Sequence, residues 1–486
     1  MYYKISDRVL FRPYNGYGYL ADNSEYGYRF LRNDYRDPGE KYVSESGSVM
    51  LSMLSRKPRA IEEIISELLQ IFEDVDIEEL KRDTEEFYDG LVAEGFLDSG
   101  VSADCCIRRE SNTSSKEVTL SDAYSGAQIR QSDFLRAIHI EVASECNERC
   151  IHCYIPHEEK LTLIKPDLFY RIVEDGRRMN IIHVTLSGGE PLLHPDIIPF
   201  LKYCHDMDLS VNVLSNLLLL DDNIIDEMRK NPLLSVQTSI YSMNPHVHDE
   251  ITGIHGSLKK TKRAVQDLIL AGIPVQISCP VMKENKDTFL DVVKWGDHNN
   301  IGTAIQPQIF AQYDHTGRNL THRLSAYEIS EVVQKMLESG YGDQWIPNSK
   351  EVISRRPKDP VCSICRYLLC VSATGVVYPC VGWQTNEINT LDHKSLREIW
   401  LNSEKISTLR QIQWNKFPKC INCEDKEYCT VCMMSNSNEN SDGDPFRINP
   451  YFCETAKAIH YVVDQYQAKR TRGNENERED TNQRCI

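Results

Sequence analysis

The first hundred residues place short aromatic segments before amphipathic helices. The segments RVLFRPY, YGYLAD and YGYRFL are broken by Gly, Asn and Pro, which predicts a small hairpin-rich sheet. Apolar residues at helical spacing then mark one helix over 61–72 and another over 77–91. Asp76 with Glu79 forms an N-terminal capping signal for the second helix, and Gly95 a stop. We expect a compact α+β domain over residues 1–98.

Residues 99–133 are rich in Ser, Asp, Asn and Thr, with weak periodicity, and predict a linker. Cys105 and Cys106 lie in this segment. Because adjacent cysteines are poor paired ligands for one metal, we interpret them as incidental thiols rather than a functional pair.

Strands and helices alternate from residue 134 to about 348. Six segments have strand character: FLRAIHIEVA, IIHVTLS, SVNVLSN, SVQTSIY, IPVQISCPV and GTAIQPQIF. Helical stretches such as PDLFYRIVEDGRRM and SLKKTKRAVQDLILAG separate them. This alternation predicts parallel strands with right-handed crossovers. The fold class is therefore α/β, with a partial (β/α)6 TIM-like barrel whose chemistry gathers where the strands end.

Residues 349–468 change character, with nine cysteines, short elements and little periodicity. Bound metal is expected to replace part of a hydrophobic core there. The polar, mixed-charge segment 469–486 predicts a disordered tail. The chain thus divides into an N-terminal domain, a linker, a partial barrel, a cysteine-rich domain and a tail.

Composition narrows the functional classes. The chain of 486 residues has 17 cysteines, a formal net charge of -17, and neither a long apolar stretch nor a signal peptide. We therefore expect a cytoplasmic protein that is neither exported nor anchored to a membrane, in which cysteines serve metal binding or redox chemistry. The negative charge opposes the phosphate attraction on which nucleic-acid binding depends, so no nucleic-acid partner is expected.

Three cysteines follow the first barrel strand in the run ECNERCIHCY. Cys146, Cys150 and Cys153 would lie in the barrel mouth. Structural zinc sites and iron-sulfur cubanes usually have four protein ligands, so three thiolates on a cubane would leave one iron with an open coordination position. The alternative is a structural zinc with His152 or His157 as fourth ligand, although the reach of His152 between two ligands is poor.

The second strand ends in LSGGEP. Gly188 and Gly189 would allow a ligand to approach the backbone, and Glu190 offers a carboxylate to a cation such as an ammonium group. A Gly-Gly turn before proline is often only a turn. The position beside the cysteine loop favours a functional interpretation.

The cysteine run followed by GGEP resembles the radical S-adenosylmethionine superfamily over roughly residues 134–310. The resemblance implies a four-iron four-sulfur cluster on Cys146, Cys150 and Cys153, whose open iron chelates S-adenosylmethionine. It also implies cofactor-binding roles near the adenine, the methionine amino group and the nucleoside. The residues at the matching positions are Tyr154, Gly188, Gly189, Glu190, Asn216 and Ser239.

The downstream cysteines resemble the SPASM extension that follows some radical S-adenosylmethionine domains. The resemblance implies two auxiliary iron-sulfur clusters, hence three clusters in all. One would be held by Cys420, Cys423, Cys429 and Cys453, and the other by Cys362, Cys365, Cys380 and Cys432.

One gap in the dense cysteine group departs from the family pattern, which leaves Cys432 in question. Cys370 could replace Cys362, but we favour a buried role for it, as for the isolated Cys204 and Cys279. A zinc ribbon remains the alternative for the whole group. Zinc has no redox chemistry, however, whereas an iron-sulfur cluster could accept an electron from a substrate radical.

By element order, the N-terminal domain resembles the winged-helix-like, PqqD-like element that recognises ribosomally made peptides. A leader peptide would then add as a strand to the edge of the sheet. The alternatives are a structural cap and a DNA-binding winged helix. The acidic run from Glu62 to Glu79 disfavours DNA.

Together, these resemblances imply an enzyme that matures a ribosomal precursor peptide through an oxidative cross-link, either a thioether or a carbon-carbon bond. An electron donor such as flavodoxin or ferredoxin is an implied partner. A peptide epimerase and a sulfatase-type protein maturase remain alternative enzymes. A zinc-stabilised winged-helix regulator is the alternative outside enzymology. The catalytic residues, the precursor and the oligomeric state are not defined by the sequence.

Overall fold

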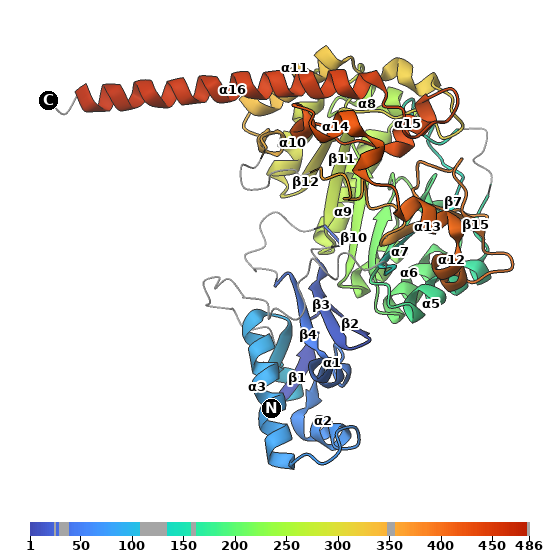
Figure 1. Cartoon of the computed structure of the whole chain (residues 1–486), viewed down its shortest axis with the longest axis vertical. Coiled ribbons are helices and arrows are strands. Elements are labelled where there is room, and N and C mark those ends of the chain that lie inside the picture. Colours follow the sequence, from blue (N-terminus) through green and yellow to red (C-terminus); the bar gives the residue numbers. More distant parts are fainter. Residues whose placement is uncertain (24–25, 29–37, 107–133, 157–161, 348–354, 484–486) are drawn as a thin grey trace.

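The computed structural model describes residues 1–23, 26–28, 38–106, 134–156, 162–347 and 355–483, with side chains up to residue 470. Figure 1 shows an N-terminal domain below a larger body, with the last helix extending away from that body. In the part of the chain that the structure describes, no helix combines the length and apolar character needed to cross a membrane.

The described residues of the N-terminal domain form two small antiparallel sheets and three α-helices. One sheet has the order β5-β1-β6 and the other β2-β3-β4. A core of buried apolar side chains from Tyr3 to Leu97 joins the strands to the helices. The elements are β1 (Tyr2–Ile5), β2 (Val9–Tyr14), β3 (Tyr17–Asp22), β4 (Glu40–Ser44), α1 (Glu45–Ser52), β5 (Arg59–Ala60), α2 (Ile61–Leu68), α3 (Ile77–Glu94) and β6 (Leu97–Gly100).

Local signals account for the limits of α3. The Asp76 carboxylate accepts hydrogen bonds from the backbone N–H groups of Glu78 and Glu79, as an N-cap does. Gly95 ends the helix at φ 90°, in the left-handed conformation that glycine adopts without steric cost. Both signals agree with the prediction from sequence.

Three sequence-based expectations for the ends of segments differ from the structure. Tyr26–Tyr28, the described part of the third aromatic segment, is turn and bend, and β4 supplies the third strand instead. The expected linker begins inside β6, because Ser99 and Gly100 pair with β1, and residues 107–133 lie outside the described ranges. The expected tail continues a helix to Gln483, since no proline interrupts this segment.

Six parallel strands form the predicted open barrel, and the sheet extends beyond them. The order is β12-β11-β10-β9-β8-β7-β13-β14-β15, with β13 parallel to β7 and the last two strands antiparallel. The cysteine-rich region thus completes the sheet rather than forming a separate body. The strands are β7 (Ala137–Ala143), β8 (His183–Gly188), β9 (Ser210–Leu214), β10 (Leu234–Ser239), β11 (Val275–Pro280), β12 (Gly302–Gln306), β13 (Leu368–Val371), β14 (Val376–Tyr378) and β15 (Asn389–Thr390).

Helices pack their apolar faces against this sheet, in one continuous core with the cysteine-rich region. The barrel helices are α5 (Pro166–Arg178), α6 (Ile197–Asp206), α7 (Asp222–Lys230), α8 (Pro245–Thr252), α9 (Ser257–Leu270), α10 (Phe289–His298) and α11 (Ala326–Glu338). The later helices are α12 (Leu396–Asn402), α13 (Glu404–Arg410), α14 (Pro418–Ile421), α15 (Met433–Glu439) and α16 (Pro450–Gln483). Much of α16 packs along α11 (Figure 1).

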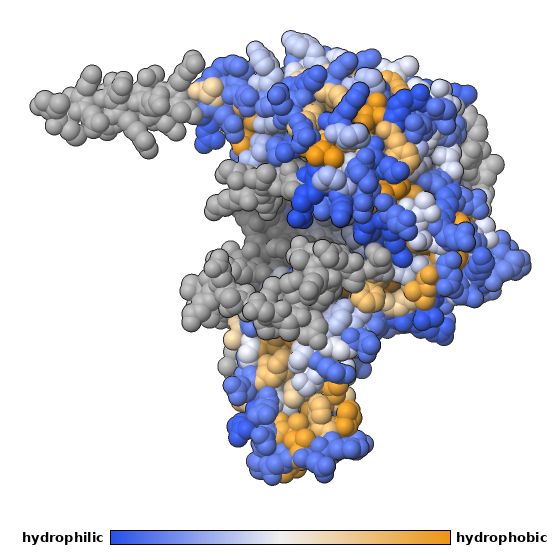
Figure 2. All heavy atoms as spheres, viewed as in Figure 1, coloured by the Kyte–Doolittle hydropathy of each residue, from blue (hydrophilic) through white to orange (hydrophobic). Residues whose placement is uncertain are grey.

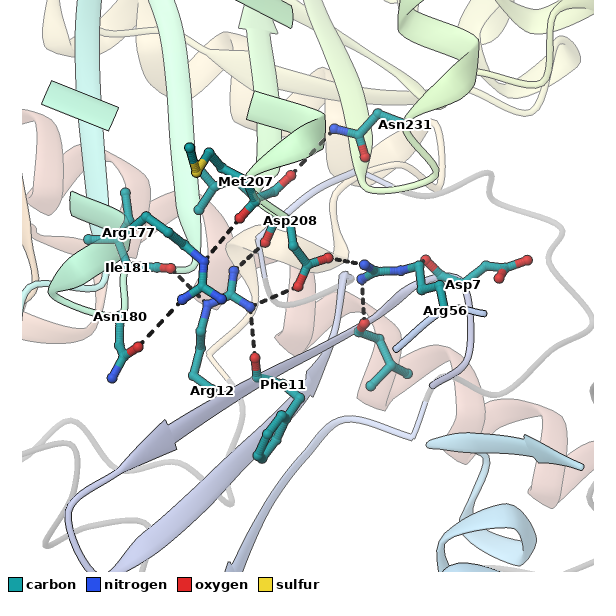
Figure 3. A network of polar contacts seen from close by, with 12 residues as sticks. Asp7, Phe11, Arg12, Arg56, Arg177, Asn180, Ile181, Met207, Asp208 and Asn231 are labelled. Atoms are coloured by element: carbon teal, nitrogen blue, oxygen red, sulfur yellow. Dashed lines mark hydrogen bonds and ion pairs between the residues drawn. The ribbon is translucent and has the colours of Figure 1, made fainter. Parts of the chain in front are cut away.

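The N-terminal domain docks at the edge of the barrel where the strands begin. Arg12 in β2 is fully buried, donates from Nε to the Ile181 carbonyl at 3.0 Å, and forms an ion pair of 2.9 Å with Asp208. Arg56 also pairs with Asp208 (Figure 3). Asn180 donates to the Pro13 carbonyl at 2.6 Å. Because Ile181 and Asp208 immediately precede β8 and β9, this interface lies opposite the strand ends that carry the candidate site.

Apolar contacts reinforce the same junction. Leu10, Tyr19 and Ala21 of the N-terminal sheet form a buried cluster with Ile182 and Leu233 of the barrel. Elsewhere on the domain, apolar side chains are exposed around the connection between α2 and α3, and Figure 2 shows apolar surface at the far end of the domain. The exposed set includes Leu69, Ile71, Val75 and Ile77.

Candidate functional site

The first cysteine loop leaves β7 and is tied to neighbouring elements by its backbone. Arg149 and Ile151 donate to the carbonyls of Thr252 and Ile251 at 2.9 and 3.0 Å, at the end of α8. The Cys153 N–H donates to the Cys150 carbonyl at 3.1 Å. The three thiols therefore sit on one short loop at the carboxyl edge of the sheet, where the sequence predicts them.

Charges and thiols are close together in this loop. Glu148 is buried, and the Cys150 thiol lies 3.3 Å from its carboxylate. Burial is the main cause that raises the pKa of Cys150, and the charges of Glu148, Cys153 and Cys146 raise it further. A bound cation would reverse that penalty by stabilising the thiolates.

Gly188 and Gly189 allow β8 to end in direct contact with the cysteine loop. Gly188 has φ 131°, and a Cβ there would lie 1.8 Å from the Ala143 carbonyl oxygen. A Cβ on Gly189 would lie 2.0 Å from the Glu145 carbonyl oxygen. The Gly189 N–H donates to Ala143 at 2.7 Å, and the Glu190 N–H to Glu145 at 2.8 Å. These glycines therefore fix the start of the cysteine loop as well as the end of the strand.

The Glu190 carboxylate is fully buried and already bonded. It accepts from the Leu192 N–H at 2.9 Å, the Ser215 hydroxyl at 2.7 Å and the Asn216 N–H at 2.7 Å. Burial raises the pKa of Glu190 to about 7, while these hydrogen bonds act to lower it. In this conformation Glu190 joins the ends of β8 and β9, whereas the sequence assigns it to the cofactor's amino group.

Asn216 and Ser239 lie where the next two strands end. The Asn216 amide donates to Asn147 at 2.6 Å and lies 4.0 Å from the Cys146 sulfur. Burial is the main cause that raises the pKa of Tyr241, while a side-chain hydrogen bond with Ser239, the last residue of β10, acts to lower it. The Tyr241 hydroxyl lies 3.9 Å from the Cys150 sulfur. Asn216 thus contacts the cysteine loop directly, whereas Ser239 is linked to the loop through Tyr241, a residue that the sequence did not predict.

A cavity of about 180 Å³ opens beside the two glycines. The barrel contributes Glu141, Gly188 and Gly189 to its wall, and the cysteine-rich region contributes the turn 372–374, Tyr378 and Gln384. Tyr154 is not part of this lining, although burial and then the Glu141 charge raise its pKa. The sequence prediction omitted Glu141, yet an acidic residue on the same face as His139, in an otherwise apolar strand, is a signal that could have identified it.

The later cysteines fall into two neighbourhoods. Burial raises the pKa of Cys362 to about 11, and the charges of Cys432 and Cys380 raise it further. Cys453 interacts electrostatically with Cys420, Cys423 and Cys429. The neighbourhoods contain Cys362, Cys365, Cys380 and Cys432 in one case, and Cys420, Cys423, Cys429 and Cys453 in the other.

As the side chains stand, no three Cys, His, Asp or Glu residues within the described ranges converge closely enough to hold a metal ion. The residue types and their two neighbourhoods nevertheless fit two thiolate-held clusters. Cys370 is buried and interacts with Cys380, Glu141 and Cys365, so it borders the first neighbourhood.

Arg355 organises the second neighbourhood and was not predicted. It is buried, donates to the carbonyls of Cys420 at 3.2 Å and Lys426 at 3.0 Å, and also donates to the Cys429 carbonyl. Burial is the main cause that raises the pKa values of Cys420 and Cys429. The charge of Arg355 is the next cause, and it acts to lower both pKa values. A buried cation beside thiols favours the thiolate form that binds metal.

Three family models match the chain. Residues 140–296 match the radical SAM superfamily, residues 37–97 match coenzyme PQQ synthesis protein D, and residues 362–424 match an iron-sulfur cluster-binding domain called SPASM. The last match stops before Cys429, Cys432 and Cys453.

Individual proteins are similar over most of their own length. An AdoMet-dependent heme synthase of Methanosarcina barkeri is 25% identical over 61% of this chain and 90% of its own. A PqqA peptide cyclase of Bradyrhizobium diazoefficiens is 23% identical over 63% of this chain and 84% of its own. The crystal structure of Streptococcus suis SuiB bound to precursor peptide SuiA has a TM-score of 0.57 at 13% identity, over 92% of this chain and 99% of that chain. This last likeness is one of fold.

Proposed function

Because the chain belongs to the radical S-adenosylmethionine superfamily and carries PqqD-like and SPASM regions, we propose that it is an enzyme that cross-links a ribosomally made precursor peptide. The observation that carries the proposal is the shared cavity. Gly188 and Gly189 of the barrel and the turn 372–374 of the cysteine-rich region line one chamber. A substrate there would touch both cysteine-bearing parts of the molecule.

The proposed cofactors are S-adenosylmethionine and three four-iron four-sulfur clusters. Cys146, Cys150 and Cys153 would hold the cluster that binds S-adenosylmethionine, and the two later thiol neighbourhoods would hold the others. When bound and reduced, these groups supply a 5'-deoxyadenosyl radical and a route for one electron away from the substrate.

The chain's own residues position and shield this chemistry. Gly188 and Gly189 hold the cysteine loop against β8, and Asn216 fixes Asn147 inside that loop. Tyr154, Gly188, Gly189, Glu190, Asn216 and Ser239 are proposed to surround the cofactor, with Glu190 acting through Ser215 and Asn216 as a positioning residue. Tyr313 and Tyr378 line the cavity and would limit the access of water.

The leader of the precursor is proposed to bind the N-terminal domain. Among the described strands, β4 pairs with β3 alone, and we propose that its other edge accepts the leader as an added strand. Strand addition supplies affinity through backbone hydrogen bonds and specificity through side-chain pockets. The relatives include a PqqA peptide cyclase and a structure solved with a precursor peptide, which supports a peptide substrate here.

The proposed product is an oxidative cross-link, with a thioether favoured and a carbon-carbon bond as the second choice. The cross-link would remove two hydrogen atoms from the peptide: one would leave as a hydrogen atom to the radical that the bound cofactor supplies, and the other as one proton and one electron. The SPASM cysteines favour this outcome because a cross-link needs an electron acceptor, whereas an epimerase needs a hydrogen donor. A reduced flavodoxin or ferredoxin is proposed as the electron donor.

Dependence on a leader tests the proposal. The reconstituted full chain, S-adenosylmethionine and a reductant are incubated anaerobically with the precursor peptide encoded beside the enzyme, or with the same peptide lacking its leader. We expect modification of the complete peptide and little of the truncated one, with 5'-deoxyadenosine formed alongside the modified product. Equal modification of both peptides would contradict the recognition role and favour a sulfatase-type maturase.

A further inference from the structure

Glu141 brings a buried carboxyl to the wall of the cavity. It lies near the end of β7, is 6% exposed, and lines the cavity together with Gly188 and Gly189. Among the described residues, the Gln384 side-chain amide donates to its two carboxylate oxygens at 2.9 and 3.0 Å. A carboxylate offers about four acceptor positions, so Glu141 can accept further donors from a ligand.

The rest of the described cavity wall is uncharged. Among the described residues that line the cavity there is no Lys, Arg or His side chain and no second acidic side chain. Burying a carboxylate without a nearby cation costs desolvation free energy. A ligand that brings a cation to the carboxylate would therefore be attracted strongly, because little water screens the two charges. The cavity therefore has the electrostatic character of a receptor for a positively charged group.

Glu190, the other buried carboxyl at this edge, has a different role. Its oxygens are occupied by Leu192, Ser215 and Asn216, and it does not line the cavity. The two carboxyls are thus separated in function: Glu190 joins strand ends, while Glu141 faces the chamber that a substrate would enter.

Within the function proposed above, we propose that Glu141 is a specificity-determining residue that binds the ammonium or guanidinium group of a lysine or arginine in the substrate peptide. The side chain would enter past the turn 372–374, which leaves Gly188 and Gly189 to the cofactor, and its cationic end would meet the carboxylate held by Gln384. Because Gln384 belongs to the cysteine-rich region, that region sets the position of the anchor on a barrel strand.

Two matched peptides test this anchor without requiring turnover. The probes are N-acetylated tripeptide amides, Gly-Lys-Gly and Gly-norleucine-Gly, which differ mainly in the ammonium group. Their binding to the cluster-reconstituted full chain is measured by calorimetry with saturating S-adenosylmethionine. We expect the wild-type chain to bind the lysine peptide at least about tenfold more tightly, as a charge-assisted hydrogen bond predicts.

Two variants should remove this preference by different routes. Glu141→Gln removes the negative charge of the carboxylate. Gln384→Lys keeps that charge but supplies a cation within the protein that pairs with it. Both should bind the two peptides within about twofold of each other. Glu227→Gln is the matched control, since Glu227 is a buried glutamate on α7 that pairs with Lys230 away from the cavity. Glu227→Gln should keep the wild-type preference for the lysine peptide. If Glu141→Gln does not fold, the peptide preference of Gln384→Lys tests the proposal.

Three outcomes would overturn the anchor: no lysine preference in the wild-type chain, a preference that survives both variants, or a loss confined to S-adenosylmethionine binding. The last would assign Glu141 to the cofactor's own ammonium group. Failure of the proposed function is distinguishable, because absence of peptide processing together with an intact lysine preference would leave the anchor standing.

Discussion

At the residue scale, the glycines at the end of β8 determine whether the cysteine loop can reach its position. The sequence predicts Gly188 and Gly189 at a strand end beside the cysteines, and they are there. The reason could not be predicted, because the atoms that exclude a Cβ belong to Ala143 and Glu145, more than forty residues earlier in the chain. The bonded state of Glu190 was hidden for the same reason, since Ser215 and Asn216 come from the following strand.

Gly189→Ala is expected to displace the cysteine loop, because the new Cβ would overlap a carbonyl oxygen. Reconstituted protein should contain about four fewer irons than the wild-type chain, which would carry about twelve in three clusters. Gly302→Ala in β12 is the control, since a Cβ there meets no atom within 4 Å. The measurement is the iron and sulfide content per chain. If Gly189→Ala contained as much iron as the wild-type chain, the packing of the cysteine loop against Gly189 would be contradicted.

Cys432 and Cys370 give opposite expectations. Cys432→Ala should cost about one cluster, because Cys432 interacts with Cys362 and Cys380. Cys370→Ala should retain all the iron, since Cys370 is expected to pack as a small buried apolar residue. The measurement is the iron content of each variant compared with that of the wild-type chain. Loss of iron in Cys370→Ala but not in Cys432→Ala would mean that Cys370, and not Cys432, holds the cluster.

At the element scale, the six barrel strands were predictable because each is a local apolar run bounded by turns and helices. The strands β13 to β15 were not predicted, since two to four residues carry little periodicity and their pairing with β7 is non-local. The docking of β2 through Arg12 was equally hidden. An arginine in a short aromatic strand would be expected on the surface from the sequence. Arg12 is instead buried, because its partners Ile181 and Asp208 lie just before β8 and β9.

Asp208→Asn should loosen this docking. The change leaves the buried Arg12 guanidinium without its anionic partner, and because Asp208 is 35% exposed the cost should be below the about 3–5 kcal/mol typical of a fully buried pair. We expect formation of 5'-deoxyadenosine to persist while leader-dependent peptide modification falls at least about tenfold. Asp206→Asn is the control, because Asp206 forms only an exposed pair with Lys202. Equal peptide modification by the two variants would show that the interface is dispensable.

At the scale of the whole molecule, the N-terminal domain, where we propose that the leader binds, and the cavity, where we propose that the chemistry occurs, lie at opposite edges of one sheet. Figure 1 shows the N-terminal domain below the barrel. The N-terminal domain contacts the residues that precede β8 and β9, whereas the cavity lies where β7 and β8 end. The six residues of β8 separate these edges by about 20 Å. A peptide held by its leader must therefore span the height of the barrel.

This distance sets a minimum spacer in the precursor. At about 3.3–3.6 Å per extended residue, at least about six residues must separate the leader-binding segment from the modified residue. Deleting spacer residues below that length should abolish modification. Inserting a short Gly-Ser stretch should be tolerated, because doubling a loop costs only about 0.6 kcal/mol. Mass spectrometry of a spacer series is the measurement, and modification independent of spacer length would contradict this geometry.

An oxidative cross-link in a leader-bearing peptide changes the mass of that peptide, so its accurate mass is the measurement to make. After anaerobic turnover by the reconstituted full chain, we expect a product lighter by two hydrogen atoms per cross-link, with one 5'-deoxyadenosine formed for each. A peptide of unchanged mass, with deoxyadenosine still produced, would show that the chain does not form such a cross-link.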